Sequence, residues 1–295
     1  MRFRVVDIET IPDLSVWTPG EDQWKLACSK MIDKGAYLPS GSVLPSSWQG
    51  VAAKTDSIAC VEKVEPFPPP QAHRVVAIAY VDIVMDIDKS PRYRCDGGSS
   101  NCQWTLTHDN ENTIEVLLLM KFSDAMTATN EGNISLVTWN GRGFDLPVLS
   151  MRSLKLGVPF GWYYSDRDMR YRYSENGHLD LMDFLGDYGA ARFMKLDDVA
   201  HLVGLPGKIA GGITGASVHD IYKSSLTYPE LAIQKMAAVG RYCLQDAIQT
   251  ALIFLRTRFH MGRIDRGEYN NCLSTFAESD FITKAIDIDW DKVRL

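Results

Sequence analysis

The sequence lacks any run of about 18 apolar residues, the length that a membrane-spanning helix requires. It begins directly with a β-branched stretch, without the basic and apolar segments of a secretory signal and without an Arg-rich transit region. We therefore expect a soluble, cytoplasmic protein with no membrane partner. The 295 residues are 45% hydrophobic, which is enough apolar material for a sizeable core.

Cysteine is sparse, and its spacing does not indicate a zinc site. None of the six cysteines lies in a C-x-x-C pair or in another arrangement typical of zinc ligands. Reduced thiols are expected in the cytoplasm, and a disulfide between Cys95 and Cys102 is the alternative.

Positive charge is in deficit, with 31 Lys and Arg against 37 Asp and Glu and a net charge of −6. This balance argues against a protein that coats nucleic acid by bulk electrostatics, because such a surface needs clustered Lys and Arg. It is compatible with a nuclease, because an acidic pocket that holds metal ions lowers the net charge while a local basic rim binds the phosphates.

Hydrophobic patterning predicts an α/β fold in which helices flank a mixed sheet. The segment 13–71 contains three tryptophans and ends in a proline-rich run, so we expect a long N-terminal insertion there. Residues 88–101, which include the run GGSS, are expected to form a hairpin connection. Strands are expected at 3–10, 74–84, 103–107 and 134–139, and helices at 111–126 and 228–258.

The first strand carries two carboxylates, Asp7 and Glu9, in a D-x-E pattern. Side chains alternate along a strand, so these two point to the same face, while Val6 and Ile8 point to the other. Two like charges side by side repel one another, and a divalent cation would neutralise them. The alternative is a solvated edge strand whose polar residues face water.

A glycine-rich run, NGRGFDLPVL at 140–149, follows the fourth strand and leads into a helix. Asp145 lies near the N-terminus of that helix, where it is either a member of an acidic site or only a helix cap. A later run, GLPGK at 204–208, differs from a phosphate-binding loop, which has four residues between its glycines and a Ser or Thr after the lysine. We expect a turn between helices there.

The long helix at 228–258 contains Tyr242 and Asp246 in a Y-x-x-x-D pattern. Residues four apart lie on one face of a helix, so the hydroxyl and the carboxylate can reach the same place. Taken singly, Tyr242 would be an ordinary half-buried tyrosine, and Asp246 a residue on a solvated face.

Taken together and in this order, D-x-E, N-x-x-x-F-D and Y-x-x-x-D resemble the DEDDy group of the 3′-5′ exonuclease superfamily, whose fold is RNase H-like. Within it, the chain is similar to predicted exonucleases related to the proofreading domain of family B DNA polymerases, which have counterparts of 178–183 and 204–208. The resemblance extends to about Arg258, so residues 1–258 are expected to form the exonuclease domain and 259–295 a C-terminal helical extension.

The resemblance implies a site for two Mg²⁺ or Mn²⁺ ions, with Tyr242 orienting the attacking water. We expect Asp180 to be a structural acid beside this site and Asp183 to be a helix cap. The expected metal ligands are Asp7, Glu9, Asp145 and Asp246, and with Tyr242 they form the expected catalytic set.

Residues next to the motifs are candidates for binding the substrate. Ile11 is a candidate wedge against the last base, whereas Trp139 and Phe144 could equally belong to the core. Arg170 and Arg172 lie in a segment at 161–173 where tyrosines and arginines alternate, which suits stacked bases and bound phosphates but also suits a surface loop held by its tyrosines. The candidate substrate contacts are Thr10, Ile11, Trp139, Asn140, Phe144, Arg170 and Arg172.

We therefore expect a metal-dependent 3′-5′ exonuclease that hydrolyses the 3′ ends of single-stranded DNA to nucleoside 5′-monophosphates. One alternative is an exoribonuclease on the same fold, and another is a nucleic-acid-binding module without useful catalysis. The residues after Arg258 are too few for a polymerase domain, so a proofreading role would require a separate polymerase or repair partner.

Overall fold

The computed structural model describes residues 1–20, 23, 67–85, 93–101, 111–127, 134–191, 193–208 and 212–295. The chain divides into two compact units, one formed by Met1–Ile11 and Arg74–Leu295 and the other by Pro12–His73. The insertion expected at 13–71 falls within the second unit. This unit contains a short 3-10 helix, η2 (Pro70–Ala72). The carbonyl of its last residue, Ala72, accepts a hydrogen bond from the Asp13 amide at 2.7 Å.

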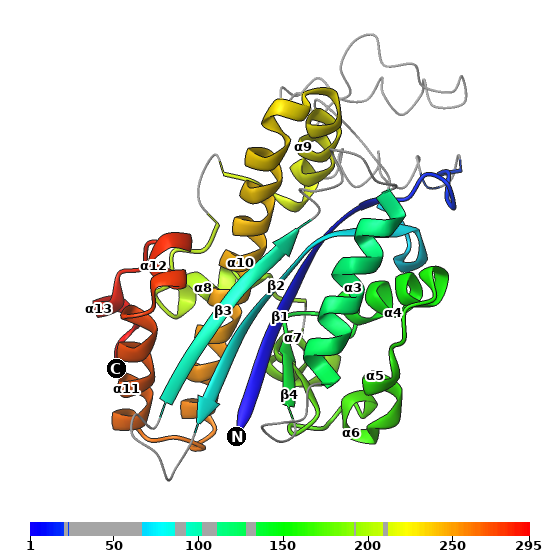
Figure 1. Ribbon diagram of the computed structural model, residues 1–295. Coiled ribbons are helices and arrows are strands. Elements are labelled where there is room, and N and C mark those ends of the chain that lie inside the picture. Colours follow the sequence, from blue (N-terminus) through cyan, green and yellow to red (C-terminus); the bar gives the residue numbers. More distant parts are fainter. Residues whose placement is uncertain are drawn as a thin grey trace, which may run out of the picture. The chain divides into compact units, whose positions relative to one another are not determined.

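The first unit is built on a five-stranded sheet in the order β3-β2-β1-β4-β5 (Figure 1). β1 runs parallel to β4, β4 runs parallel to β5, and β2 is antiparallel to β3. Met1 and Met85 exchange hydrogen bonds, so the start of β1 lies opposite the end of β2 and these strands are antiparallel. The strands are β1 (Arg2–Pro12), β2 (His73–Met85), β3 (Tyr93–Asn101), β4 (Ile134–Thr138) and β5 (His178–Asp180).

Helices cover both faces of this sheet. Phe3 packs on Phe254 of α10 with ring centroids 4.8 Å apart, whereas Arg4 donates to the Ala125 carbonyl of α3. Because neighbouring strand residues point to opposite faces, α10 and α3 lie on opposite sides of β1. The predicted mixed sheet flanked by helices is thus confirmed. The helices are α3 (Glu111–Thr127), α4 (Asp145–Leu156), α5 (Gly161–Ser165), α6 (Arg167–Arg170), α7 (Leu181–Leu185), α8 (Leu196–Leu202), α9 (Gly215–Thr227), α10 (Pro229–His260), α11 (Arg266–Ala277), α12 (Asp280–Ala285) and α13 (Trp290–Val293).

The expectation of a hairpin connection at 88–101 was wrong, because residues 93–101 form β3. The glycines that suggested a turn allow a close approach, since a Cβ on Gly97 would lie 2.6 Å from the ring of Phe281 and 2.8 Å from the Tyr80 carbonyl. Packing on α10, α11 and α12 stabilises this strand despite its low β-propensity. The strand expected at 103–107 lies outside the described residues.

The thiol of Cys95 is free and donates to the carbonyl of Thr275 at 3.6 Å. Cys102, its alternative disulfide partner, lies outside the described residues. None of the helices in the described ranges combines the length and the hydropathy that a membrane span requires.

A buried ion pair joins α3 and α4 beneath the sheet. Arg152 and Glu115 are 0% and 1% exposed, and the guanidinium Nε donates to Glu115 Oε1 at 2.6 Å. The same carboxylate accepts the Val75 amide of β2 at 2.9 Å and lies 3.7 Å from the Arg74 guanidinium. The helices α3 and α4 are therefore fixed to β2 by the hydrogen bonds of one carboxylate.

Candidate active site

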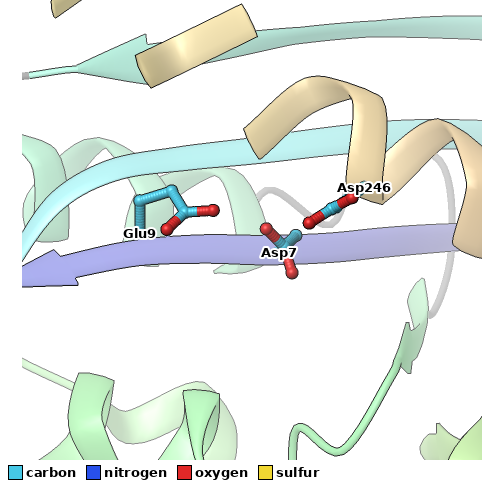
Figure 2. A group of neighbouring side chains, drawn as sticks. All are labelled: Asp7, Glu9 and Asp246. Carbon is cyan, nitrogen blue, oxygen red and sulfur yellow. The ribbon is translucent and has the colours of Figure 1, made fainter. Parts of the chain in front are cut away.

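Three of the four predicted metal ligands meet where α10 crosses β1. The alternation of β1 directs Asp7 and Glu9 toward α10, and Figure 2 shows the carboxylate of Asp246 directed at that of Asp7. One carboxylate oxygen from each of the three residues lies within 4.8 Å of the others. An all-oxygen set of this kind suits Mg²⁺ or Mn²⁺ better than zinc, so the residues present fit the expected cations.

The fourth carboxylate, Asp145, lies outside this group of three within the described residues. It is the first residue of α4, is 5% exposed, and accepts a hydrogen bond from the backbone amide of Ile8 in β1. Phe144 occupies the N-cap position, so Asp145 is not the helix cap that the sequence allowed as an alternative. Its charge is nevertheless close enough to raise the pKa values of Asp7 and Glu9.

Burial and mutual repulsion make these carboxylates difficult to ionise. Burial is the main reason that the pKa values of Asp7, Glu9 and Asp246 lie above their usual range, and repulsion from Asp246 adds to the shifts of Asp7 and Glu9. Burial also raises the pKa of Asp145 to about 7. Such an arrangement is costly for a chain without cations, and divalent cations would relieve it.

Tyr242 lies beside this group on α10, one turn before Asp246, as the helical spacing predicts. Its hydroxyl donates to the Asp246 carboxylate, and the ammonium of Lys208 donates to the hydroxyl oxygen at 2.9 Å. Burial and the neighbouring carboxylates raise the pKa of Tyr242 far above that of free tyrosine, so the phenol stays protonated. Tyr242 can therefore donate a hydrogen bond and orient a water molecule.

Lys208 is a site residue that the sequence analysis missed. Gly207 adopts a positive φ of 66° and packs so closely on α8 that a Cβ there would lie 2.4 Å from Asp197 Oδ1. The Lys208 amide donates to the same oxygen at 2.6 Å, which holds the turn and directs the ammonium to Tyr242. The signal in the sequence is the lysine that follows two glycines at 204–208, a segment with a counterpart in the resembled family.

Cys243 was also missed, although it lies between the two motif residues of α10. Its thiol is buried and donates to the backbone carbonyl of Asp7 at 3.3 Å and to Asp7 Oδ2 at 3.5 Å. Burial and the nearby carboxylates raise its pKa, so it remains a hydrogen-bond donor. This contact fixes α10 on β1 at the position of the first ligand.

Asp180, expected to be a structural acid, organises the turn that carries Asp145. Its carboxylate accepts the amides of Asn140 and Arg142, both at 2.9 Å, and the first of these residues has a positive φ of 60°. Asp180 also caps α7 by accepting the Asp183 amide. The expected cap, Asp183, was therefore assigned wrongly: it lies in the first turn, because Asp180 is the last extended residue before the helix.

The candidate substrate contacts differ in their accessibility. Ile11 is 4% exposed and belongs to the core, and Trp139 and Phe144 are half-buried against the core. Thr10 and Asn140 are half-buried at the ends of β1 and of the Asp145 turn. Their proposed contacts with the terminal nucleotide remain predictions.

The segment at 161–173 presents exposed tyrosine rings, and two of its three arginines contact neighbouring side chains, whereas the third, Arg167, is exposed. Arg172 pairs with Asp183 through two hydrogen bonds, and the Arg170 guanidinium lies 5.1 Å from the centre of the Tyr164 ring. Tyr171 and Tyr173 are about half exposed, with ring centroids 5.6 Å apart. The exposed tyrosine rings of this segment therefore suit the stacking of bases, whereas Arg170 and Arg172 are less available to bind phosphate.

The raised pKa values predict how stability depends on pH. A carboxyl whose pKa is higher in the folded chain than in the unfolded chain binds more protons when folded, so stability falls as pH rises from about 4 through the folded-state pKa. With a pKa of about 7 at Asp145, the melting temperature in EDTA should fall between about pH 4 and about pH 7 and level off above that. Mn²⁺ should oppose this fall.

Thermal melts of the wild type, Asp145→Asn and the exposed control Asp124→Asn would measure this effect. The fall should be smaller in Asp145→Asn and unchanged in Asp124→Asn. The same fall in all three proteins would show that the buried carboxyl is not its source.

Comparison with known proteins places the chain in a family. A model of a "Predicted 3'-5' exonuclease related to the exonuclease domain of PolB" matches residues 65–286, so Asp145, Tyr242 and Asp246 lie inside the match and Asp7 and Glu9 outside it. No curated protein matches. The family B DNA polymerase of the archaeon Pyrobaculum calidifontis is 17% identical, with a TM-score of 0.44, over 94% of this chain but only 29% of the polymerase. Because the family model covers well over half of the sequence, the chain belongs to the predicted 3′-5′ exonucleases related to the exonuclease domain of PolB.

Proposed function

We propose that the protein is a metal-dependent 3′-5′ exonuclease that removes nucleoside 5′-monophosphates from the 3′ ends of single-stranded DNA. The observation that supports this most is the group formed by Asp7, Glu9 and Asp246, with Tyr242 and Lys208 directly beside it. Acidic ligands, a neutral phenol and one cation in a single place are the groups that phosphodiester hydrolysis needs.

Two Mg²⁺ or Mn²⁺ ions are the proposed cofactors, held by Asp7, Glu9, Asp246 and the adjoining Asp145. When bound, the ions polarise the phosphodiester and lower the pKa of a water molecule. The fold holds these ligands in fixed positions, because two of them lie on a strand of the sheet and the third lies on a helix packed against that strand.

Tyr242 and Lys208 are proposed to act on the water and on the phosphate. The protonated phenol can hold the attacking water in line with the phosphorus, and the ammonium fixes the position of the phenol oxygen. Lys208 is also a cation on the surface of an acidic site, so it can receive the negative charge of the scissile group.

A single strand is the proposed substrate because exposed rings suit unpaired bases. Tyr171 and Tyr173 belong to a segment that Arg142 ties to the Asp145 turn, since its guanidinium donates to the carbonyls of Tyr171 and His178. DNA is proposed ahead of RNA. A separate polymerase or repair protein is the proposed partner, because the family is related to the exonuclease domain of PolB.

Incubation of 5′-labelled DNA and RNA oligonucleotides with Mg²⁺ or Mn²⁺ tests the activity. The expected result is a ladder that shortens from the 3′ end of the DNA and disappears in EDTA. A 3′-blocked oligonucleotide should resist. If RNA is shortened faster than DNA, the substrate is RNA. If neither is shortened, the proposal that the protein is an exonuclease is rejected.

Tyr242→Phe should lower kcat by roughly 10- to 100-fold, the range found when groups that orient a reacting species are lost. KM should change little, because the ring remains. The shape of the pH profile should not change, since the phenol stays protonated throughout. Tyr228→Phe, on an exposed ring at the start of α10, is the matched control. An unchanged kcat in Tyr242→Phe would reduce Tyr242 to a packing role.

A further inference from the structure

A cavity of about 190 Å³ adjoins the carboxylate group, and Tyr242 and Asp246 of α10 form part of its wall. It lies between this helix and the turn that carries Lys208. The residues of α10 that line the cavity recur every three or four positions, so they lie on one face of the helix. The same face carries Tyr242 and Asp246 of the candidate active site. The lining residues of α10 are Ala238, Arg241, Tyr242, Gln245, Asp246 and Gln249.

Two cations line this cavity, and one of them is not engaged. The guanidinium of Arg241 is exposed and makes no hydrogen bond or ion pair with another residue in the described part of the chain. By contrast, Arg152 and Arg172 hold carboxylates, and Arg142 holds backbone carbonyls. The guanidinium of Arg241 is therefore available to bind an anion in the cavity, whereas the other three arginines bind groups of the protein.

A second wall residue also has an unsatisfied group. Gln249 is 2% exposed, and its Oε1 has no hydrogen-bond partner among the described residues. Buried polar atoms are normally paired with protein or ordered water. A hydrated ligand in the cavity brings water that can supply the missing donor.

We propose that this cavity is a phosphate subsite, in which Arg241 binds the phosphodiester next to the scissile one, while Lys208 lies on the wall that the subsite shares with the candidate active site. The proposal rests on the proposed function, because the scissile phosphate is taken to lie at Asp7, Glu9 and Asp246. A guanidinium fork matches two phosphate oxygens, and an ammonium adds a point charge. The subsite thus counters the charge of a strand that enters an otherwise acidic site.

Binding can be measured without turnover by the fluorescence anisotropy of a labelled single-stranded DNA in EDTA. Arg241→Gln should weaken binding by about 5- to 20-fold, as expected for a lost charge-assisted contact. Arg241→Lys should recover part of the affinity. Arg266→Gln, an exposed arginine on α11, is the control that should bind like the wild type. Equal affinities of Arg241→Gln and the wild type would overturn the subsite.

The phosphate of the released nucleoside 5′-monophosphate could bind the same subsite as a phosphodiester of the strand. Kinetic measurements distinguish these two ligands. For a strand phosphodiester, Arg241→Gln should raise KM for oligonucleotides and leave unchanged the KM for the p-nitrophenyl ester of thymidine 5′-monophosphate, which has one phosphate. Weaker inhibition by thymidine 5′-monophosphate, with unchanged oligonucleotide binding, would overturn the proposal in favour of the product.

The outcomes for the two proposals are distinguishable. If the wild type binds DNA, Arg241→Gln binds it weakly, and neither cleaves any substrate, the exonuclease is rejected, and the cavity stands only as a phosphate-binding site of a DNA-binding protein. If the wild type cleaves DNA and Arg241→Gln binds and cleaves it equally well, the subsite is rejected and the exonuclease stands.

Discussion

Asp7→Asn should lower the rate of DNA hydrolysis by about 10³-fold or more, since several kcal/mol of transition-state stabilisation depend on the metal ligands. The same change should stabilise the cation-free protein by about 0.5–2 kcal/mol. Asp7 is half-buried, its charge is repelled by Asp246, Asp145 and Glu9, and a neutral amide of the same shape removes that repulsion. Loss of activity with a gain in stability distinguishes a functional carboxylate from a structural one.

Initial rates with a labelled oligonucleotide and thermal melts in EDTA would measure both effects. Asp124→Asn, an exposed change of the same kind on α3, should alter neither. Calorimetric titration with Mn²⁺ adds a direct readout, because Asp7→Asn should also bind the ion more weakly. Activity close to that of the wild type would show that the site is wrongly assigned.

Arg152→Leu should reduce the free energy of unfolding by about 3–5 kcal/mol, the range for breaking a buried ion pair. The change leaves Glu115 inside the protein without the guanidinium that donates to both of its oxygens. Only the Val75 amide and the more distant Arg74 guanidinium, at 3.7 Å, would remain near it among the contacts described above. Urea denaturation monitored by circular dichroism measures the loss.

The double variant Glu115→Leu/Arg152→Leu separates a buried charge from a general packing defect. Its stability should recover most of the loss, because a hydrophobic pair removes both charges and their desolvation cost. A double variant as unstable as Arg152→Leu would show instead that the hydrogen bonds to β2 carry the stability at this position.

The parts of the site that follow from local periodicity were predictable. The two-residue repeat of a strand placed Asp7 and Glu9 on one face, and the helical repeat placed Tyr242 above Asp246. The sheet and the long helix α10 followed from hydrophobic patterning. That these two elements meet required the resemblance, because no local rule connects residues more than 200 positions apart.

The parts that depend on tertiary packing were not predictable. β3 has the composition of a turn and becomes a strand because α10, α11 and α12 pack against it. Lys208 acquires a role only because α8 holds its turn against α10. The positive charge of Arg172 suggested phosphate binding, but Asp183, which is eleven residues later, neutralises it.

The two halves of the site are far apart in the sequence, so they are synthesised at different times. Asp7 and Glu9 leave the ribosome more than 200 residues before Tyr242 and Asp246. Because domains fold as their segments emerge and distant contacts form late, the group of Asp7, Glu9 and Asp246 is incomplete until α10 is synthesised and docked. The growing chain thus stays without a complete ligand set while it is still close to its own messenger RNA.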